Sequence, residues 1–173
     1  MGLMVAISND QQLRSITFWM LGSLGGARWQ ALMPLLVCTL PALVILPLLG
    51  GKLNTLALGE AEARHLGISV QRMKSLITAL VALAVAATVA LTGIIGFVGL
   101  VVPHLLRLII GPDYRRLLPA SALLGATLML IADLVSRVAI APGELPIGAV
   151  TAIVGAPFFL GLLLLDRRRG KLI

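Results

Sequence analysis

The stretch LITALVALAVAATVALTGII at residues 76–95 decides the fold, because its 20 residues include no charged side chain. A helix needs about 20 mostly apolar residues to cross the hydrocarbon core of a bilayer. Apolar residues make up 59% of the whole chain and charged residues only 12%, whereas soluble domains carry roughly 25% charged residues. Because similar stretches recur along the chain, a single signal peptide does not explain them. The sequence therefore predicts an all-α polytopic transmembrane protein.

Other apolar segments lie on both sides of this stretch. Together they predict about five full spans plus an N-terminal partial helix whose beginning is missing. The expected spans are residues 29–49, 76–95, 96–110, 118–139 and 147–165, and the partial helix is residues 1–7. Residues 96–110 form the weakest of these spans, because about 15 residues are marginal for crossing. Residues 8–30 are polar and rich in glycine, so we expect an interfacial segment with a short helix at 11–21.

The basic residues indicate the topology. Lys and Arg gather in residues 50–75, in residues 111–117 and in the C-terminal tail, whereas residues 93–96 and 140–146 contain none. Cytoplasmic connections of membrane proteins are enriched in Lys and Arg. The three basic segments, including the C-terminus, are therefore expected in the cytoplasm. The positive-inside pattern accounts for the net charge of +7. Aromatic residues, which stack on bases, make up only 4% of the chain, so no nucleic-acid partner is expected.

The longest basic segment contains the sequence LALGEAEARHLG at residues 56–67. Its Ala, Leu, Glu and Arg residues favour a short helix. Asn54 or Thr55 can cap the start of that helix, and Gly67 suits a left-handed stop at its end. A short helix at the membrane face is suited to docking into a groove of a partner. A solvated loop helix without a partner is an equal alternative.

Two groups of unusual residues lie within the apolar segments. Glycines recur at positions 93, 96 and 99, a pattern that lets two helices touch or breaks one helix. His104 and Arg107 are one turn apart, and ionisable residues in a span suggest function. The alternative is that His104 bonds a carbonyl while Arg107 extends to the cytoplasmic surface.

Asp133 and Arg137 lie four residues apart, a spacing that allows an ion pair on one helix face. Arg137 is near the outer end of its span, where it also suits an acidic partner outside the cell. A proton-relay role for Asp133 is a further alternative.

The sequence predicts neither catalysis nor metal binding. Cys38 is the only cysteine and lies in an apolar run, so a buried, unreactive thiol is expected. His65 is expected in a loop and His104 in a span, so no nucleophile, base and orienting acid come together.

Several of these motifs, in this order, resemble the FecCD-type permeases of bacterial ABC importers, which take up iron-siderophores, heme and vitamin B12. The matching segments are WMLGSLGG (19–26), LALGEAEARHLG (56–67), GFVGLVVPHLLR (96–107), ADLVSR (132–137), ELPIG (144–148), Thr151 and GAPFF (155–159). Members of the family have about ten spans and are nearly twice this length. The resemblance therefore implies that residues 1–173 are the C-terminal half of a transmembrane domain like that of the vitamin B12 permease, with residues 50–75 as its cytoplasmic coupling loop.

The resemblance also implies partners. Such permeases form homodimers with the translocation path along the dimer interface, and a periplasmic binding protein delivers the chelate. Two cytoplasmic ATPase subunits dock under the coupling loops and use ATP, so the permease itself is neither an enzyme nor a holder of cofactors. The residues expected to contact the ATPase are Gly59, Glu60, Ala61, Ala63, Arg64, Leu66 and Gly67. Arg137 is expected to dock the binding protein. The structural positions of the family motifs are Gly96, Gly99, Pro103, His104, Arg107, Asp133, Pro146, Gly148 and Pro157.

The leading interpretation is thus a permease subunit in the bacterial inner membrane for heme or a siderophore. The alternatives are a vitamin B12 permease, a truncated fragment that does not transport, and a proton-coupled secondary transporter that uses Asp133. His104 does not identify heme as the substrate, because the resemblance places it in a motif common to the family.

Overall fold

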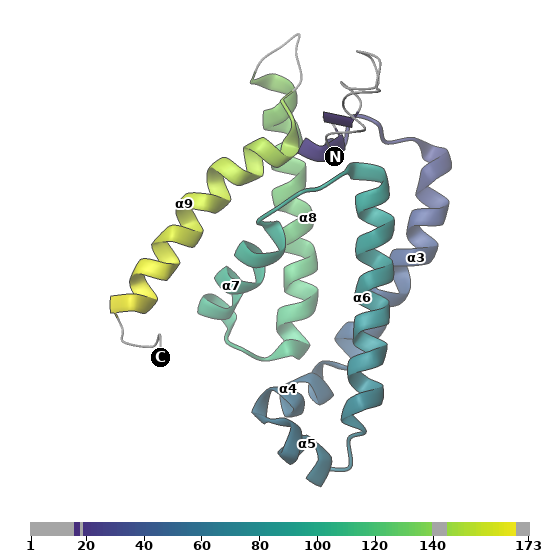
Figure 1. Cartoon of the computed structure of the whole chain (residues 1–173), viewed down its shortest axis with the longest axis vertical. Coiled ribbons are helices and arrows are strands. Elements are labelled where there is room, and N and C mark those ends of the chain that lie inside the picture. The colour runs from purple at the N-terminus through teal and green to yellow at the C-terminus, as the bar shows by residue number, and fades with distance from the viewer. Residues whose placement is uncertain (1–15, 18, 140–144, 169–173) are drawn as a thin grey trace, which may run out of the picture. The chain divides into compact units, whose positions relative to one another are not determined.

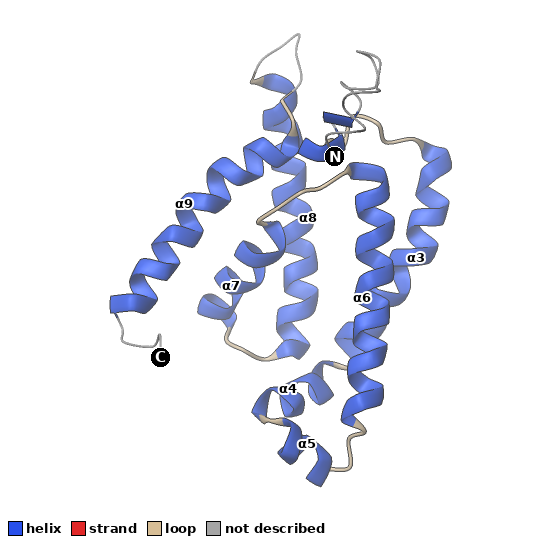
Figure 2. Ribbon diagram, in the orientation of Figure 1, coloured by secondary structure: helices blue, strands red, loops and turns tan. Residues whose placement is uncertain are grey.

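The computed structural model describes residues 16–17, 19–139 and 145–168, and every regular element within these ranges is a helix (Figures 1 and 2). This confirms the all-α prediction. The helices are α3 (Trp29–Leu48), α4 (Gly50–Leu58), α5 (Glu60–His65), α6 (Val70–Thr92), α7 (Val98–Ile110), α8 (Tyr114–Val138) and α9 (Ile147–Arg168). The partial helix expected at residues 1–7 lies outside the described residues. Of the helix expected at residues 11–21, the described positions 16–17 and 19–21 are helical.

Three of the five expected spans have the length and hydropathy to cross a bilayer. They are α3, α6 and α8, whereas α7 and the apolar part of α9, described as Ile147–Gly161, are shorter apolar helices. The prediction for residues 96–110 needs correction, because the 13 residues of α7 rise only about 20 Å against a hydrocarbon core of about 30 Å.

The backbone on either side of α7 explains its short length. Gly93 and Phe97 have positive φ angles of 73° and 66°, and the residues between them are not helical. At the other end Gly111 has a φ of 84°. An α-helix cannot continue through left-handed residues, so α7 is stopped at both ends.

The long helices expose large apolar side chains along their length. Leu48 is 80% exposed, Val37 is 72% exposed and Leu123 is 73% exposed. A soluble monomer rarely shows a continuous apolar surface of this kind, and it marks contact with lipid or with other protein. The exposure therefore agrees with the membrane placement predicted from composition.

The described chain consists of two compact units. One contains Arg28–Leu91 and Val102–Leu128, and the other contains Met1–Ala27, Thr92–Val101 and Met129–Ile173. The buried apolar side chains of the first unit are Ala42, Ala63, Val70, Met73, Val102, Leu106 and Leu117, and those of the second are Val101, Ala132 and Ile147. The first unit holds residues 50–75, and the second holds Asp133 and Arg137.

Candidate functional site

Two short helices, α4 and α5, connect α3 to α6 and pack against each other (Figure 1). The single helix expected at residues 56–67 is therefore wrong. Gly59, with a φ of 136°, ends α4 and precedes α5. A Cβ atom at this position would lie 2.5 Å from the Glu62 Oε2 atom, so a side chain would be both strained and crowded.

The end of α5 follows the predicted glycine stop. Gly67 has a φ of 77°, its N–H donates to the Arg64 carbonyl at 2.9 Å, and the Ile68 N–H donates to the Ala63 carbonyl at 2.9 Å. Paired bonds of this type satisfy the last carbonyls of a helix. The next helix, α6, begins at Val70, six residues before the expected span at 76–95. Its first residues are polar, so the apolar pattern did not include them.

Most of the residues predicted to contact an ATPase are on the surface of this module. Glu60, Ala61, Arg64 and Gly67 are exposed, and Leu66 is 69% exposed. Ala63, in contrast, is 0% exposed, so its small side chain packs inside the module and does not face a partner in this structure. Leu66, next to Gly67 at the end of α5, therefore offers an exposed apolar side chain to a partner.

Glu60 fixes the orientation of α5 relative to α6. Its carboxylate accepts hydrogen bonds from the Lys74 ammonium group, on α6, and from the Arg64 guanidinium group at 3.3 Å. The hydrogen bond from Lys74 is the main reason that the pKa of Glu60 lies below its ordinary value. These groups are exposed, so the pairs are screened by solvent and orient the helix more than they stabilise it.

Asn54 provides a second connection, which the sequence did not reveal. Its Nδ2 atom donates to the Asp113 Oδ1 atom at 2.6 Å, and its Oδ1 atom accepts from the Tyr114 backbone N–H at 2.8 Å. The expected capping role is wrong, because Asn54 lies inside α4, and no side chain caps that helix. Its partners are 59 and 60 residues away, so no local pattern pointed to them.

Asp113 links this connection to the start of α8. Its Oδ1 atom also accepts from the Arg115 N–H at 3.0 Å, which satisfies a free donor in the first turn of α8. The pKa of Asp113 lies below its ordinary value, chiefly because of the hydrogen bond from Asn54. The carboxylate therefore remains ionised at neutral pH and holds α4 and α8 together.

Two further contacts bring α4, α7 and α8 together. A Cβ atom on Gly50 would lie 2.8 Å from the Arg115 Cα atom, so only glycine lets these backbones approach so closely. The Arg107 guanidinium group, on α7, donates to the Tyr114 hydroxyl at 2.8 Å and lies 5.5 Å from the centre of the Tyr114 ring. Arg107 thus has a specific partner beyond its predicted extension to the surface.

The second compact unit contains a group of backbone hydrogen bonds between distant segments. The Trp19 carbonyl accepts from the N–H groups of Gly22 and Ile94, each at 3.3 Å. The Gly22 carbonyl in turn accepts from the Ile147 N–H at 3.0 Å. Segments near residues 20, 94 and 147 are therefore joined directly through their main chains.

Two glycines make this close packing possible. A Cβ atom on Gly93 would overlap the Trp19 carbonyl, and one on Gly148 would overlap the Leu21 carbonyl. Added Cβ atoms on Gly96 and Gly99, by contrast, would have no described neighbour within 4 Å. The glycines at 93, 96 and 99 were expected either to let two helices touch or to break one helix. Gly93 does both, because it follows the last residue of α6 with a positive φ and meets the Trp19 carbonyl.

The ion pair between Asp133 and Arg137 is confirmed, with the Arg137 Nε atom 2.9 Å from the Asp133 Oδ2 atom. Beside it, the Ser136 hydroxyl donates to the Leu145 carbonyl, and the Leu145 N–H donates to the Ser136 carbonyl at 3.2 Å. These bonds hold the residues before Pro146 against the end of α8. The remaining motif residue of this turn, Glu144, lies outside the described residues.

The remaining motif residues lie within helices or pack against other side chains. Pro103 lies inside α7 and Pro157 inside α9, and His104 is partly buried on α7. A Cβ atom on Gly155 would lie 2.6 Å from the Phe97 Cγ atom, so this glycine accommodates the Phe97 ring. Within the described ranges, no three His, Cys, Asp or Glu side chains are grouped to hold a metal ion.

Comparisons with known proteins agree with the helical architecture. A family model described as the FecCD transport family matches residues 1–165. The hemin transport system permease protein of Yersinia pestis is 45% identical over 97% of this chain and 50% of its own length. The vitamin B12 import system permease protein of Vibrio cholerae is 48% identical over 90% of this chain and 47% of its own length.

A solved structure has the same fold. It is an inward-facing conformation assigned to a metal-chelate type ABC transporter, with a TM-score of 0.86 and 40% identity. The match covers 95% of this chain and 53% of that one. The chain described here spans about half the length of the curated relatives it matches.

Proposed function

Because this chain belongs to the FecCD transport family, we propose that it is part of the membrane-spanning subunit of an ATP-driven importer. In this proposal the chain lies in a bacterial inner membrane, and two copies of the complete subunit form the translocation path. A separate ATPase hydrolyses ATP, and a periplasmic binding protein delivers the substrate. Residues 50–75 would be the coupling segment, on the cytoplasmic side together with the C-terminus.

One observation carries this proposal: α4 and α5 form a structured module that is joined to the start of α8 through Asn54. A partner that pushes on α5 would move α4, because the two helices pack together. The bonds of Asn54 to Asp113 and Tyr114 would then carry that movement into α8. A solvated loop without a partner has no need for such a connection, so the module is better suited to transmit force.

For the substrate we propose a metal chelate, with heme or a siderophore first and vitamin B12 as the alternative. The relative named for hemin and the relative named for vitamin B12 have similar identity to this chain, 45% and 48%. Heme and vitamin B12 are both bulky metal chelates, so a wide translocation path would suit either of them. Hemin and cyanocobalamin are therefore the two substrates to compare.

The ATPase contact is tested by Ala61→Trp. Ala61 is exposed on α5, so the large ring is expected to block a partner groove without disturbing the chain. Co-purification of the ATPase and ATP-dependent uptake should both fall at least about tenfold, as expected when a bulky group disrupts an interface centre. Ala79→Trp is the matched control, because Ala79 is exposed within the α6 span, and it should retain both properties.

The same measurement separates the rival mechanism. Uptake that continues in Ala61→Trp after the ATPase is lost, and that a protonophore abolishes, would replace this proposal with proton-coupled transport. Substituting Glu60 would be a less specific test, because Glu60 also holds Arg64 and Lys74. The ion pair of Asp133 with Arg137 gives that carboxylate a structural role, which favours the ATP-driven mechanism.

We further propose that Arg137 docks the binding protein. Its side chain is 50% exposed, and Asp133 orients it at the end of α8. Arg137→Glu is expected to weaken binding of the periplasmic protein about tenfold at low salt, with a smaller effect at high salt because exposed charges are screened. Arg137→Lys keeps the charge and should stay within about threefold. An Arg137→Glu affinity that equals the unaltered one at low ionic strength would exclude this role.

A further inference from the structure

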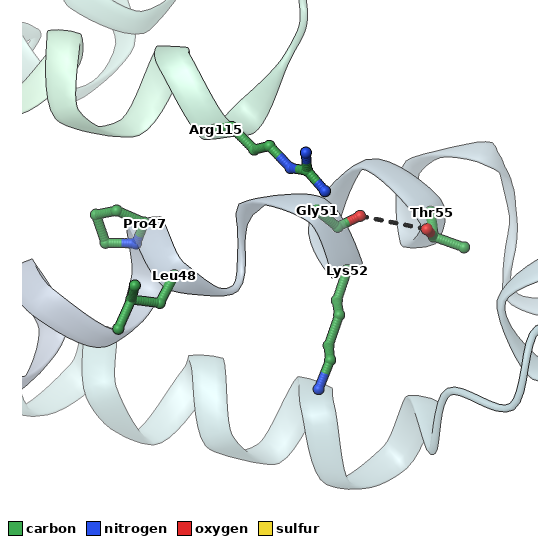
Figure 3. Close-up of a pocket in the computed structure, with 6 residues that line it drawn as sticks. All are labelled: Pro47, Leu48, Gly51, Lys52, Thr55 and Arg115. Atoms are coloured by element: carbon green, nitrogen blue, oxygen red, sulfur yellow. Dashed lines mark hydrogen bonds between the residues drawn. The ribbon is translucent and has the colours of Figure 1, made fainter.

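An open hollow lies between α4 and the start of α6. It is lined by the basic residues Lys52 and Arg72, by the apolar residues Leu49, Met73 and Leu76, and by residues 66–69 of the connection between α5 and α6. A neighbouring hollow is lined by Lys52, Pro47 and Arg115 among others, and Lys52 extends to the side of α4 opposite Arg115 (Figure 3). The Lys52 side chain is thus directed away from Arg115.

Basic and apolar side chains lie close together in this hollow, as they do at the interface between a membrane and water. Lys52 follows Leu49 by three residues, and Arg72 precedes Leu76 by four, so each cation lies about one turn from an apolar side chain. On α6, Arg72 comes before the apolar residues of the candidate span. Leu76, at the start of the apolar part of α6, is 44% exposed. The apolar wall therefore continues into the surface of the membrane helix.

The two cations at this hollow form no ion pair with another described residue. Glu60, on α5, is bound to Arg64 and Lys74. Asp113 is bound to Asn54. Within the part of the chain that the structure describes, neither Lys52 nor Arg72 forms an ion pair. Two uncompensated cations beside an apolar wall favour a ligand with an anionic head and an apolar tail.

We propose that this hollow binds an anionic phospholipid, with its phosphate between Lys52 and Arg72 and an acyl chain along Leu76. Basic pockets beside membrane helices on the cytoplasmic face bind anionic headgroups in this way. The proposal uses the membrane placement and the cytoplasmic orientation of the coupling segment in the proposed function, and it does not depend on transport. A protein surface is the alternative occupant, but the wall formed by Met73 and Leu76 leads into the span, where lipid is the neighbour.

The test is native mass spectrometry of the protein purified from its host membrane with the subunits that accompany it. The probes are phosphatidylglycerol and phosphatidylcholine, without ATP or substrate. Lys52→Gln with Arg72→Gln should bind phosphatidylglycerol about 30-fold more weakly, since each basic side chain near an anionic surface contributes about fivefold. Phosphatidylcholine binding should not change.

Arg64→Gln with Arg116→Gln is the matched control. It removes the same charge from two exposed residues that do not line the hollow and keeps the Lys74–Glu60 pair, so phosphatidylglycerol affinity should change less than about threefold. Lys52→Arg with Arg72→Lys should restore binding and shows that the site folds. Equal losses in the two glutamine pairs, or unchanged affinity in the Lys52 and Arg72 pair, would overturn the proposal. Loss of the ATPase with lipid binding intact would assign the hollow to a protein partner instead.

Discussion

Asn54→Leu is expected to reduce uptake at least about tenfold while the ATPase remains bound. The substitution keeps the size of the side chain but removes both hydrogen bonds, to Asp113 and to the Tyr114 N–H. It also leaves the Asp113 carboxylate without its main partner. One of the two bonds involves a charged group, and both are only partly buried. The free energy of unfolding should therefore fall by about 2 kcal/mol.

Transport should suffer more than stability in this variant, because α4 would no longer move with α8. The measurements are substrate uptake, ATPase co-purification and thermal unfolding in detergent. Thr55→Val is the matched control, since the Thr55 hydroxyl donates only within α4, to the Gly51 carbonyl at 3.2 Å. The exchange Asn54→Asp with Asp113→Asn should restore uptake, because it reverses donor and acceptor. Full uptake by Asn54→Leu, or an equal loss in Thr55→Val, would argue against force transmission through Asn54.

Gly93→Ala is expected to lower the free energy of unfolding by about 3 kcal/mol or more. The new methyl group would overlap the Trp19 carbonyl, and a non-glycine residue at a φ of 73° adds about 1 kcal/mol or more of backbone strain. The overlapping atom belongs to the main chain, which cannot rotate away as a side chain can. The hydrogen bonds from Gly22 and Ile94 to Trp19 would have to shift as well.

Gly99→Ala supplies the contrast for this prediction. An added Cβ atom there has no described neighbour within 4 Å, and Gly99 lies inside α7, where alanine favours the helix by up to about 1 kcal/mol. Unfolding in detergent should therefore be destabilised by Gly93→Ala and unchanged or slightly stabilised by Gly99→Ala. Similar unfolding curves for the two variants would show that the Trp19 contact is unimportant.

Long-range contacts distinguish residues that look alike in the sequence. Gly93, Gly96 and Gly99 have equal spacing, yet of these three only Gly93 meets another described backbone segment. The local sequence predicts a helix cap at Asn54, whereas its amide binds residues 59 and 60 positions later in the chain. In each case the outcome depends on which distant segment lies opposite, and no local spacing contains that information.

The sequence by itself determined the three long apolar helices α3, α6 and α8, the charge pattern of the connections, the Asp133–Arg137 pair and the family motifs. Lipid responds to composition over about 20 residues, and an ion pair between residues four apart needs only one helix, so both are encoded locally. Only the tertiary structure decided the break at Gly59, the short α7, the Asn54 connection and the glycines that permit close approach. The break at Gly59 and the short α7 follow from positive φ angles of the backbone at Gly59, Gly93, Phe97 and Gly111, whereas the Asn54 connection and the close approach at Gly93 join segments distant in sequence. At these long-range contacts a single added Cβ atom or a lost hydrogen bond changes which packing is possible.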